Sequence, residues 1–248
     1  MRRPAAVFTI AFALGAMILA PWCGARADTR EEGPFEIEKC RTIDKPGSYK
    51  LVNNLTFSAL SGTCLQITVN LVTIDLDGFT ITEVSPNTGT GSNNATAIAA
   101  VQLFGITVRN GSILDFNIGV DLDGNGSIVE GLRVFGGSVP VDFGIIATGV
   151  VRGNTVGAVF GFGVMGTGIA ATGIVTGNYV TDSKITGIEI GQGSTVIGNN
   201  VTNTNRNPGV GLLVSCPSNV TNNTAVDNAG GNLVLNGTGC NNTNNVAP

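Results

Sequence analysis

The chain has 248 residues, a formal net charge of −4 and no histidine, and only 12% of its residues are charged. The missing histidine excludes Ser-His-Asp and Cys-His nucleophile activation, and also zinc or copper sites that depend on imidazole. The acidic balance opposes binding to nucleic acid or anionic lipid, since no cationic stripe is available to neutralise phosphates. Glycine, asparagine, threonine, valine and isoleucine are plentiful, which is typical of β-strands separated by turns.

The N-terminal segment has the pattern of a secretion signal. Arg2 and Arg3 form a basic start, residues 5–20 are mostly small and apolar, and Ala25-Arg-Ala27 offers a cleavage site. The apolar run is shorter than the roughly twenty residues that a transmembrane helix needs. We therefore expect Sec-type export with cleavage after Ala27. The product would be a secreted or periplasmic protein with no transmembrane segment in the mature chain.

The segment boundaries predict a signal peptide at 1–27, a charged lead-in or cap at 28–39 and a single domain at 40–248. Cleavage removes three arginines and no acidic residue, so the net charge becomes −7. Lipidation at Cys23 is an alternative that the bulky Trp22 before it disfavours. Twin-arginine export is a second alternative, but the residues around the arginine pair do not match that signal.

A six-residue phrase recurs through the second half of the chain and predicts the fold. Its starts lie 21 to 24 residues apart, at Val108, Val129, Val151, Val175, Val196 and Val220. Between them a small residue followed by an apolar one recurs, at Gly119, Gly144, Gly168, Gly187, Gly211 and Asn232. Such a period indicates a solenoid whose units bury their apolar faces only against their neighbours. No helical or six-residue period is visible, so we expect a right-handed parallel β-helix of about eight or nine coils.

Stacking of the coils would align equivalent residues into columns. The valines that open the phrase form one interior column, and the residues that close it, from Ile113 to Ala225, form a second. A turn column joins the two, with members Asn154, Asn178, Asn199 and Asn223. Amide side chains in such a column can hydrogen-bond from coil to coil and so satisfy backbone groups that the corner buries.

Four cysteines remain after cleavage, and their spacing matches the repeat. Cys40 and Cys64 are 24 residues apart, as are Cys216 and Cys240. One coil places the members of each pair on adjacent rungs, about 4.8 Å apart, which suits a disulfide. Of the three pairings that four cysteines permit, this geometry selects Cys40–Cys64 and Cys216–Cys240. Free buried thiols are the alternative, but export to an oxidising compartment favours bridges.

The cadence of the repeat carries a resemblance to a known group of proteins. A Gly-Ile or Gly-Val step followed by Val-x-Gly-Asn-x-Val, as in Val151-Arg-Gly-Asn-Thr-Val156, recurs over roughly residues 40–240. It resembles the β-helix repeats of the pectin-lyase-like superfamily, of the carbohydrate-binding, sugar-hydrolase and NosD-like type. This resemblance implies the fold but spans lyases, hydrolases, epimerases and adhesins. The adjacent Asp pairs, Gly-His-Gly and Arg-Ile-Lys that its pectin-active glycosidases carry are not in the sequence.

Lyases of the same fold suggest a candidate site, in which carboxylates hold Ca²⁺ against a uronate and an arginine or lysine removes a proton. Aligning Ile74 with Val108, across a loop at 85–94, predicts an outward column of Asp75, Arg109, Glu130 and Arg152. Asp75 and Glu130 could then bind a cation or substrate, and Arg109 or Arg152 could act as the base. The alternative is a solvent-exposed ladder of alternating charges, in which paired carboxylates keep each arginine protonated.

Two Asp-x-Asp phrases are further candidates. Asp75 and Asp77, and likewise Asp121 and Asp123, would project from one strand face about 7 Å apart. Carboxylates at that distance can bind calcium or act as acid and base in an inverting glycosidase, where they lie about 6.5–9.5 Å apart. Both phrases precede glycine, so the alternative is that Asp77 and Asp123 are turn residues.

The function that this sequence favours is a non-catalytic module that contacts glycans or the cell envelope, because no complete catalytic set is visible. A calcium-dependent uronate lyase that uses the charged column is one alternative, and a structural surface protein is another. The only tryptophan, Trp22, leaves with the signal, which removes the side chain that most often stacks on sugar rings. No cofactor other than calcium is suggested.

Overall fold

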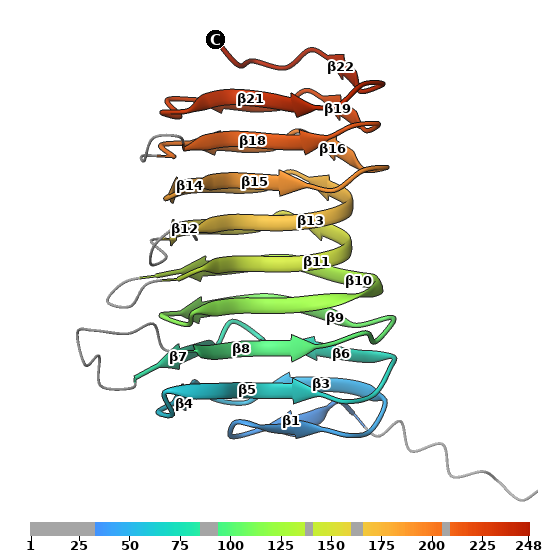
Figure 1. The fold of residues 1–248 in the computed structure, drawn as a ribbon. Coiled ribbons are helices and arrows are strands. Elements are labelled where there is room, and N and C mark those ends of the chain that lie inside the picture. The colour runs from blue at the N-terminus through green and yellow to red at the C-terminus, as the bar shows by residue number, and fades with distance from the viewer. Residues whose placement is uncertain (1–32, 85–93, 137–140, 160–165, 205–208) are drawn as a thin grey trace, which may run out of the picture. The chain divides into compact units, whose positions relative to one another are not determined.

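The computed structural model describes residues 33–84, 94–136, 141–159, 166–204 and 209–248, and within these ranges every regular element is a β-strand. The strands wind in about eight turns, and each pairs in parallel with the equivalent strand one turn later (Figure 1). The expected parallel β-helix is therefore confirmed. The signal peptide at 1–27 lies outside the described residues, and β1 (Phe35–Ile37) begins inside the segment expected to be a cap.

Each coil contributes to three sheets. The long sheet consists of β2 (Arg41–Ile43), β5 (Ser61–Ile67), β8 (Asn94–Ala100), the starts of β10 (Ile118–Phe135), β11 (Phe143–Arg152) and β13 (Thr167–Thr176), then β15 (Thr186–Ile190), β18 (Val210–Ser215) and β21 (Gly231–Asn236). The second sheet consists of β1, β3 (Gly47–Leu51), β6 (Val72–Asp75), the start of β9 (Thr107–Leu114), the middle of β10, the ends of β11 and β13, then β16 (Thr195–Ile197), β19 (Asn219–Thr221) and β22 (Asn241–Thr243). The third sheet consists of β4 (Leu55–Phe57), β7 (Thr80–Glu83), the ends of β9 and β10, then β12 (Thr155–Val159), β14 (Tyr179–Ser183), β17 (Asn200–Thr202) and β20 (Thr224–Val226).

The phrase Val151-Arg-Gly-Asn-Thr-Val156 shows how the repeat encodes one corner. Val151 and Val156 are fully buried in the second and third sheets, and Arg152 points to solvent. Gly153 has a φ of 61°, a left-handed conformation that glycine and asparagine adopt most easily, and Asn154 is buried in the turn. The same positions recur in register in the later coils, so both predicted interior columns are confirmed.

In five long-sheet strands, β10, β11, β13, β15 and β18, the glycine that precedes the apolar residue is required by close packing. A Cβ on Gly144 would lie 2.5 Å from Cγ1 of Val156 and 2.5 Å from the carbonyl oxygen of Gly168. Gly187 shows the same relation to Val201, at 2.2 Å. Glycine at this position therefore lets the valines of the third sheet pack against the long sheet.

The predicted asparagine ladder is present and buried at the corner between the second and third sheets. The side-chain oxygen of Asn178 accepts hydrogen bonds from the backbone N–H and the side-chain amide of Asn154, both at 3.0 Å. Its own amide donates to the carbonyl oxygen of Val151 and to the side-chain oxygen of Asn199, both at 2.9 Å. The ladder continues through Asn223 to Asn245, one coil further than expected. Asn245 is the fourth residue of a phrase whose opening valine is replaced by Asn242, so this last repeat is not recognisable from the sequence.

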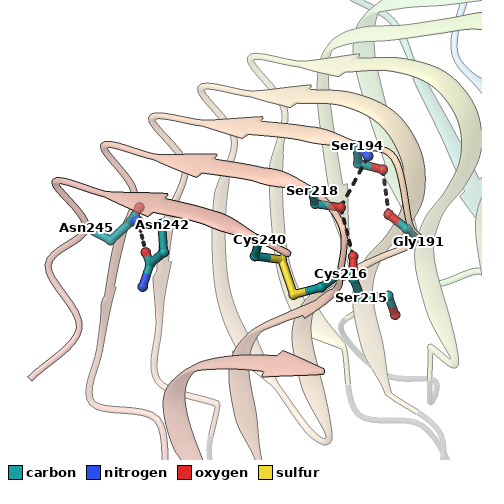
Figure 2. The surroundings of a disulfide bond; sticks show 8 residues. All are labelled: Gly191, Ser194, Ser215, Cys216, Ser218, Cys240, Asn242 and Asn245. Carbon is teal, nitrogen blue, oxygen red and sulfur yellow. Dashed lines mark hydrogen bonds between the residues drawn. A yellow bond between two sulfur atoms is a disulfide. The ribbon is translucent and has the colours of Figure 1, made fainter. Parts of the chain in front are cut away.

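Both predicted disulfides are present, one near each end of the described solenoid. Cys40–Cys64 has a Cα separation of 4.5 Å and Cys216–Cys240 one of 5.0 Å. Figure 2 shows the second bridge beside a corner where the Ser218 hydroxyl accepts a hydrogen bond from the backbone N–H of Ser194. Two disulfides indicate an extracytoplasmic compartment.

The ladder generates a stability prediction. Asn178→Ala removes the acceptor for the buried N–H of Asn154 and the donor to Val151, and each such unsatisfied group costs about 1–3 kcal/mol. We expect the free energy of unfolding in urea to fall by about 2–5 kcal/mol. Asn200→Ala, one coil away on an exposed position, is the matched control and should change it by less than about 0.5 kcal/mol. Equal losses of unfolding free energy in the two variants would contradict a stabilising role for the asparagine ladder.

Candidate functional site

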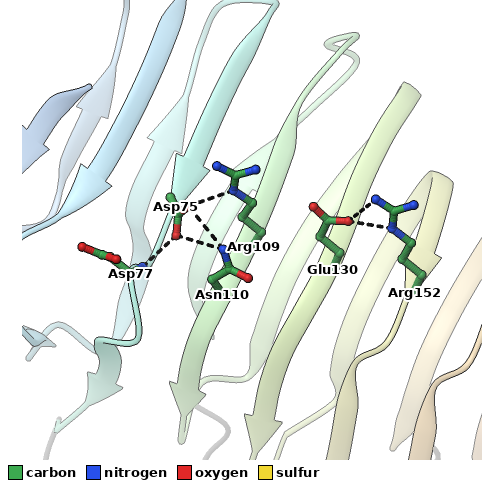
Figure 3. Close-up of polar contacts among 6 residues, drawn as sticks. All are labelled: Asp75, Asp77, Arg109, Asn110, Glu130 and Arg152. Carbon is green, nitrogen blue, oxygen red and sulfur yellow. Dashed lines mark hydrogen bonds and ion pairs between the residues drawn. The ribbon is translucent and has the colours of Figure 1, made fainter. Parts of the chain in front are cut away.

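The predicted charged column is brought together on the outer face of the second sheet. Asp75 pairs in register with Arg109, Arg109 with Glu130, and Glu130 with Arg152 (Figure 3). Lys50 lies beside Asp75 on the preceding coil, and Glu36 lies beside Lys50. The charged column therefore comprises Glu36, Lys50, Asp75, Arg109, Glu130 and Arg152, and its signs alternate throughout. Sequence reasoning missed the first two because the repeat phrase is absent from their coils.

Four residues of the charged column form two ion pairs within it. Nε of Arg109 donates to Oδ2 of Asp75 at 2.8 Å, and Nε and Nη2 of Arg152 donate to Oε2 of Glu130 at 2.6 and 2.5 Å. The arginine side chains are 42% and 56% exposed, so these are surface ion pairs. The guanidinium groups act as hydrogen-bond donors here, and a guanidinium offers no acceptor atom to a substrate proton. The arrangement is that of an ion-pair ladder.

The carboxylates of the charged column do not fit a calcium ion. Asp75 already accepts hydrogen bonds from Arg109, from the Asn110 amide and from the backbone N–H of Asp77. Ca²⁺ takes six to eight oxygens, and nowhere in the described part of the chain do three acidic, histidine or cysteine side chains gather at one point. Asp77 lies in the turn after β6, with a φ of 48°, and Figure 3 shows its side chain directed away from Asp75.

The second Asp-x-Asp phrase lies on the long sheet, away from the charged column. Asp121 pairs in register with Ala99 and Ile146, and its side chain is half-buried. Burial raises the pKa of Asp121 above its usual value, and the nearby charge of Asp123 adds to the effect. Asp123 accepts a hydrogen bond from the backbone N–H of Gln102. The four aspartates thus occupy two separate faces and do not form one site.

A shallow groove of about 250 Å³ lies on the outer face of the long sheet, and sequence reasoning missed it. Its lining comes from three consecutive coils, in β11, β13 and β15, and from the residue that follows β15. The residues are Ile146, Ala147, Thr148, Ala170, Ala171, Thr172, Glu189 and Gly191. We call this the long-sheet groove. It exists because small side chains occupy outward positions that larger residues would fill. No sequence motif marks these positions.

The parallel register fixes the layout of the long-sheet groove. Ile146, Ala170 and Glu189 are neighbours on successive coils and form one outward column. Thr148 and Thr172 form the adjacent column, two residues further along the strands. A Cβ on Gly191 would lie 2.2 Å from the Thr172 hydroxyl oxygen, so glycine there gives that side chain its space. The groove therefore has an apolar floor, a row of hydroxyls and a carboxylate at one end.

A further hollow of about 300 Å³ lies at the N-terminal end of the charged column. Lys50 and Arg109 line it together with Asp75 and Asp77. Two basic and two acidic side chains balance each other there, so this hollow has no excess charge with which to select an ionic ligand.

Comparison with known proteins supports the fold. The complex of XylC with xylose aligns at 13% identity and a TM-score of 0.50, over 67% of this chain and 34% of that one. The Dettilon tailspike protein aligns at 16% identity and a TM-score of 0.52, over 83% of this chain and 52% of that one. The A-module of the mannuronan C-5 epimerase AlgE6 of Azotobacter vinelandii aligns at 15% identity, over 77% and 71%, with a TM-score of only 0.32.

The first two likenesses show the parallel β-helix fold and nothing finer. The chain spans about one third and one half of the length of the first two structures. No family model matches the sequence, and no curated protein matches it. The described ranges contain no helix that is long and apolar enough to cross a membrane.

The charged column generates a prediction about both stability and catalysis. Replacing Arg109 by Gln removes one exposed ion pair, which is worth about 0–1 kcal/mol, so the unfolding free energy should change by no more than that. We expect neither the parent protein nor this variant to cleave polygalacturonate or alginate, with or without Ca²⁺, in an assay for unsaturated uronate products. Cleavage by the parent that is lost in Arg109→Gln would assign catalysis to the column and overturn the ladder interpretation.

Proposed function

We propose that this protein is a non-catalytic glycan-binding β-helix, exported by a Sec-type signal with cleavage after Ala27 and working in the periplasm or outside the cell. The observation that carries the proposal is the long-sheet groove. Its floor of Ile146 and Ala170 and its hydroxyl and carboxylate rim match the two surfaces of a sugar ring. Ligand sites in general combine a mostly apolar lining with a few polar groups that fix orientation.

The groove suits a small part of a longer ligand. At about 250 Å³ it lies just below the typical range for ligand pockets, and it is open along the sheet. A chain of sugars can therefore pass over it while one or two units contact the floor. The hydroxyls of Thr148 and Thr172 can donate or accept hydrogen bonds, and the two oxygens of the Glu189 carboxylate can accept hydrogen bonds from sugar hydroxyls. Few contacts and an open site favour modest affinity.

The comparisons give limited support in the same direction. One of the two compared structures with a TM-score of at least 0.50, that of XylC, was solved with xylose, which is a neutral sugar. The low identity means that its binding residues are not transferred to this chain. The support lies in the fold, since a parallel sheet of this kind presents a regular outer face on which small side chains can leave a groove.

The lyase alternative is less favoured because its residues are engaged with each other. Arg109 and Arg152 each form an ion pair with a carboxylate of the charged column. Both carboxylate oxygens of Asp75 already accept hydrogen bonds, so neither is directed at a metal. A structural role on a surface is the remaining alternative, and it predicts self-association without glycan binding.

Filling the groove should abolish binding. In Ala170→Gln a longer side chain occupies the floor between Ile146 and Glu189, and we expect the affinity for a bound glycan to fall at least tenfold. Thr176→Gln is the matched control, since it makes a similar change on the same strand but on the second sheet. A glycan array identifies the ligand, and calorimetry compares the variants. Unchanged binding in Ala170→Gln would place the site elsewhere, and an array with no signal would reject the proposal.

A further inference from the structure

We infer that the long-sheet groove selects sugars that carry no acidic group, and that it binds them along the solenoid axis between Asp121 and Glu189. This inference rests on the proposed function and adds the ligand class and its orientation. The ligand class is a polyhydroxylated ring that is either neutral or amine-bearing.

The outer face of the long sheet around the groove carries negative charge only. The long-sheet segments of β10, β11, β13, β15, β18 and β21 contain three acidic residues, Asp121, Asp123 and Glu189, and no lysine or arginine. The Glu189 side chain is exposed and, within the described residues, has no hydrogen-bond or ion-pair partner, unlike Asp75 and Glu130 of the charged column. A uronate placed in the groove would bring its carboxylate close to Glu189 with no cation to offset the repulsion.

The spacing of Asp121 and Glu189 fixes the orientation. Asp121, Ile146, Ala170 and Glu189 are register neighbours on four successive coils. Three steps of about 4.8 Å place the two carboxylates roughly 14 Å apart, with the apolar floor between them. A ligand that lies parallel to the solenoid axis contacts both the floor and the two acceptors. A ligand that lies parallel to a strand passes beyond the apolar floor after two residues of that strand. It then contacts only the column of Thr148 and Thr172.

The rim chemistry is consistent with this class. Carboxylates accept hydrogen bonds from sugar hydroxyls and from ammonium groups, and hydrogen bonds to charged acceptors are stronger than neutral ones. Burial raises the pKa of Asp121 above its usual value. As a carboxylate, Asp121 repels an anion. The face therefore discriminates by repelling acidic sugars as well as by contacting neutral ones.

The test uses three oligosaccharides of matched length, namely xylotriose, a trimer of glucosamine and trigalacturonate. Titration of the full mature chain at low ionic strength should show binding of at least one of the first two and at least tenfold weaker binding of the third. Preference for the glucosamine trimer identifies an amine ligand, and equal or better binding of xylotriose identifies a neutral one. Trigalacturonate binding that matches the others would overturn the inference while leaving a glycan-binding protein.

A charge reversal sharpens the test. Glu189→Lys should lower the affinity for the neutral or amine sugar at least tenfold and raise that for trigalacturonate, because a cation replaces the repelling carboxylate. Glu36→Lys makes the same charge change on the second sheet and should leave the order of preference unchanged. Identical selectivity in the parent and Glu189→Lys would contradict a role for this carboxylate. Absence of binding to all three oligosaccharides and to a wider array would reject the proposed function itself.

Discussion

The hydrogen bonding between equivalent residues of successive coils is the constraint on which the rest of the structure depends. Backbone pairing sets the rise from coil to coil, and the asparagine ladder fixes the corner at which each coil turns. Its amides are buried and satisfied on both sides, so a change of register by one residue would leave several polar groups unpaired. Each coil thus specifies the position of the next, and the disulfides join the outermost coils.

The same register decides what the faces can do. On the second sheet it places Asp75 beside Arg109 and Glu130 beside Arg152, and these charges neutralise each other. On the long sheet it aligns Ile146, Ala170 and Glu189, and no cation lies beside that carboxylate in the strands. The second sheet, whose charged residues stand out in the sequence, therefore has those charges paired with one another. The face without a motif has the free carboxylate and the open surface.

Much of the fold could be predicted from the sequence, because every element of the repeat serves a local physical need. The buried valines, the left-handed glycine and the corner asparagine recur at one period, and cysteines at that period must lie on adjacent coils. The site could not be predicted in the same way. The Asp75–Asp77 pair fails as a common face because β6 ends at Asp75, and strand alternation no longer applies beyond it. The groove arises from small outward residues such as Ala170, which show no pattern until the coils are stacked.

Mass-spectrometric mapping of the disulfides in the oxidised, natively folded protein tests the stacking of the coils most directly. We expect peptides that link Cys40 to Cys64 and Cys216 to Cys240, since only residues one coil apart come within bonding distance. A peptide that links Cys40 or Cys64 to Cys216 or Cys240 would contradict it. Residues two dozen positions apart would then not be neighbours, and neither the charged column nor the long-sheet groove would exist.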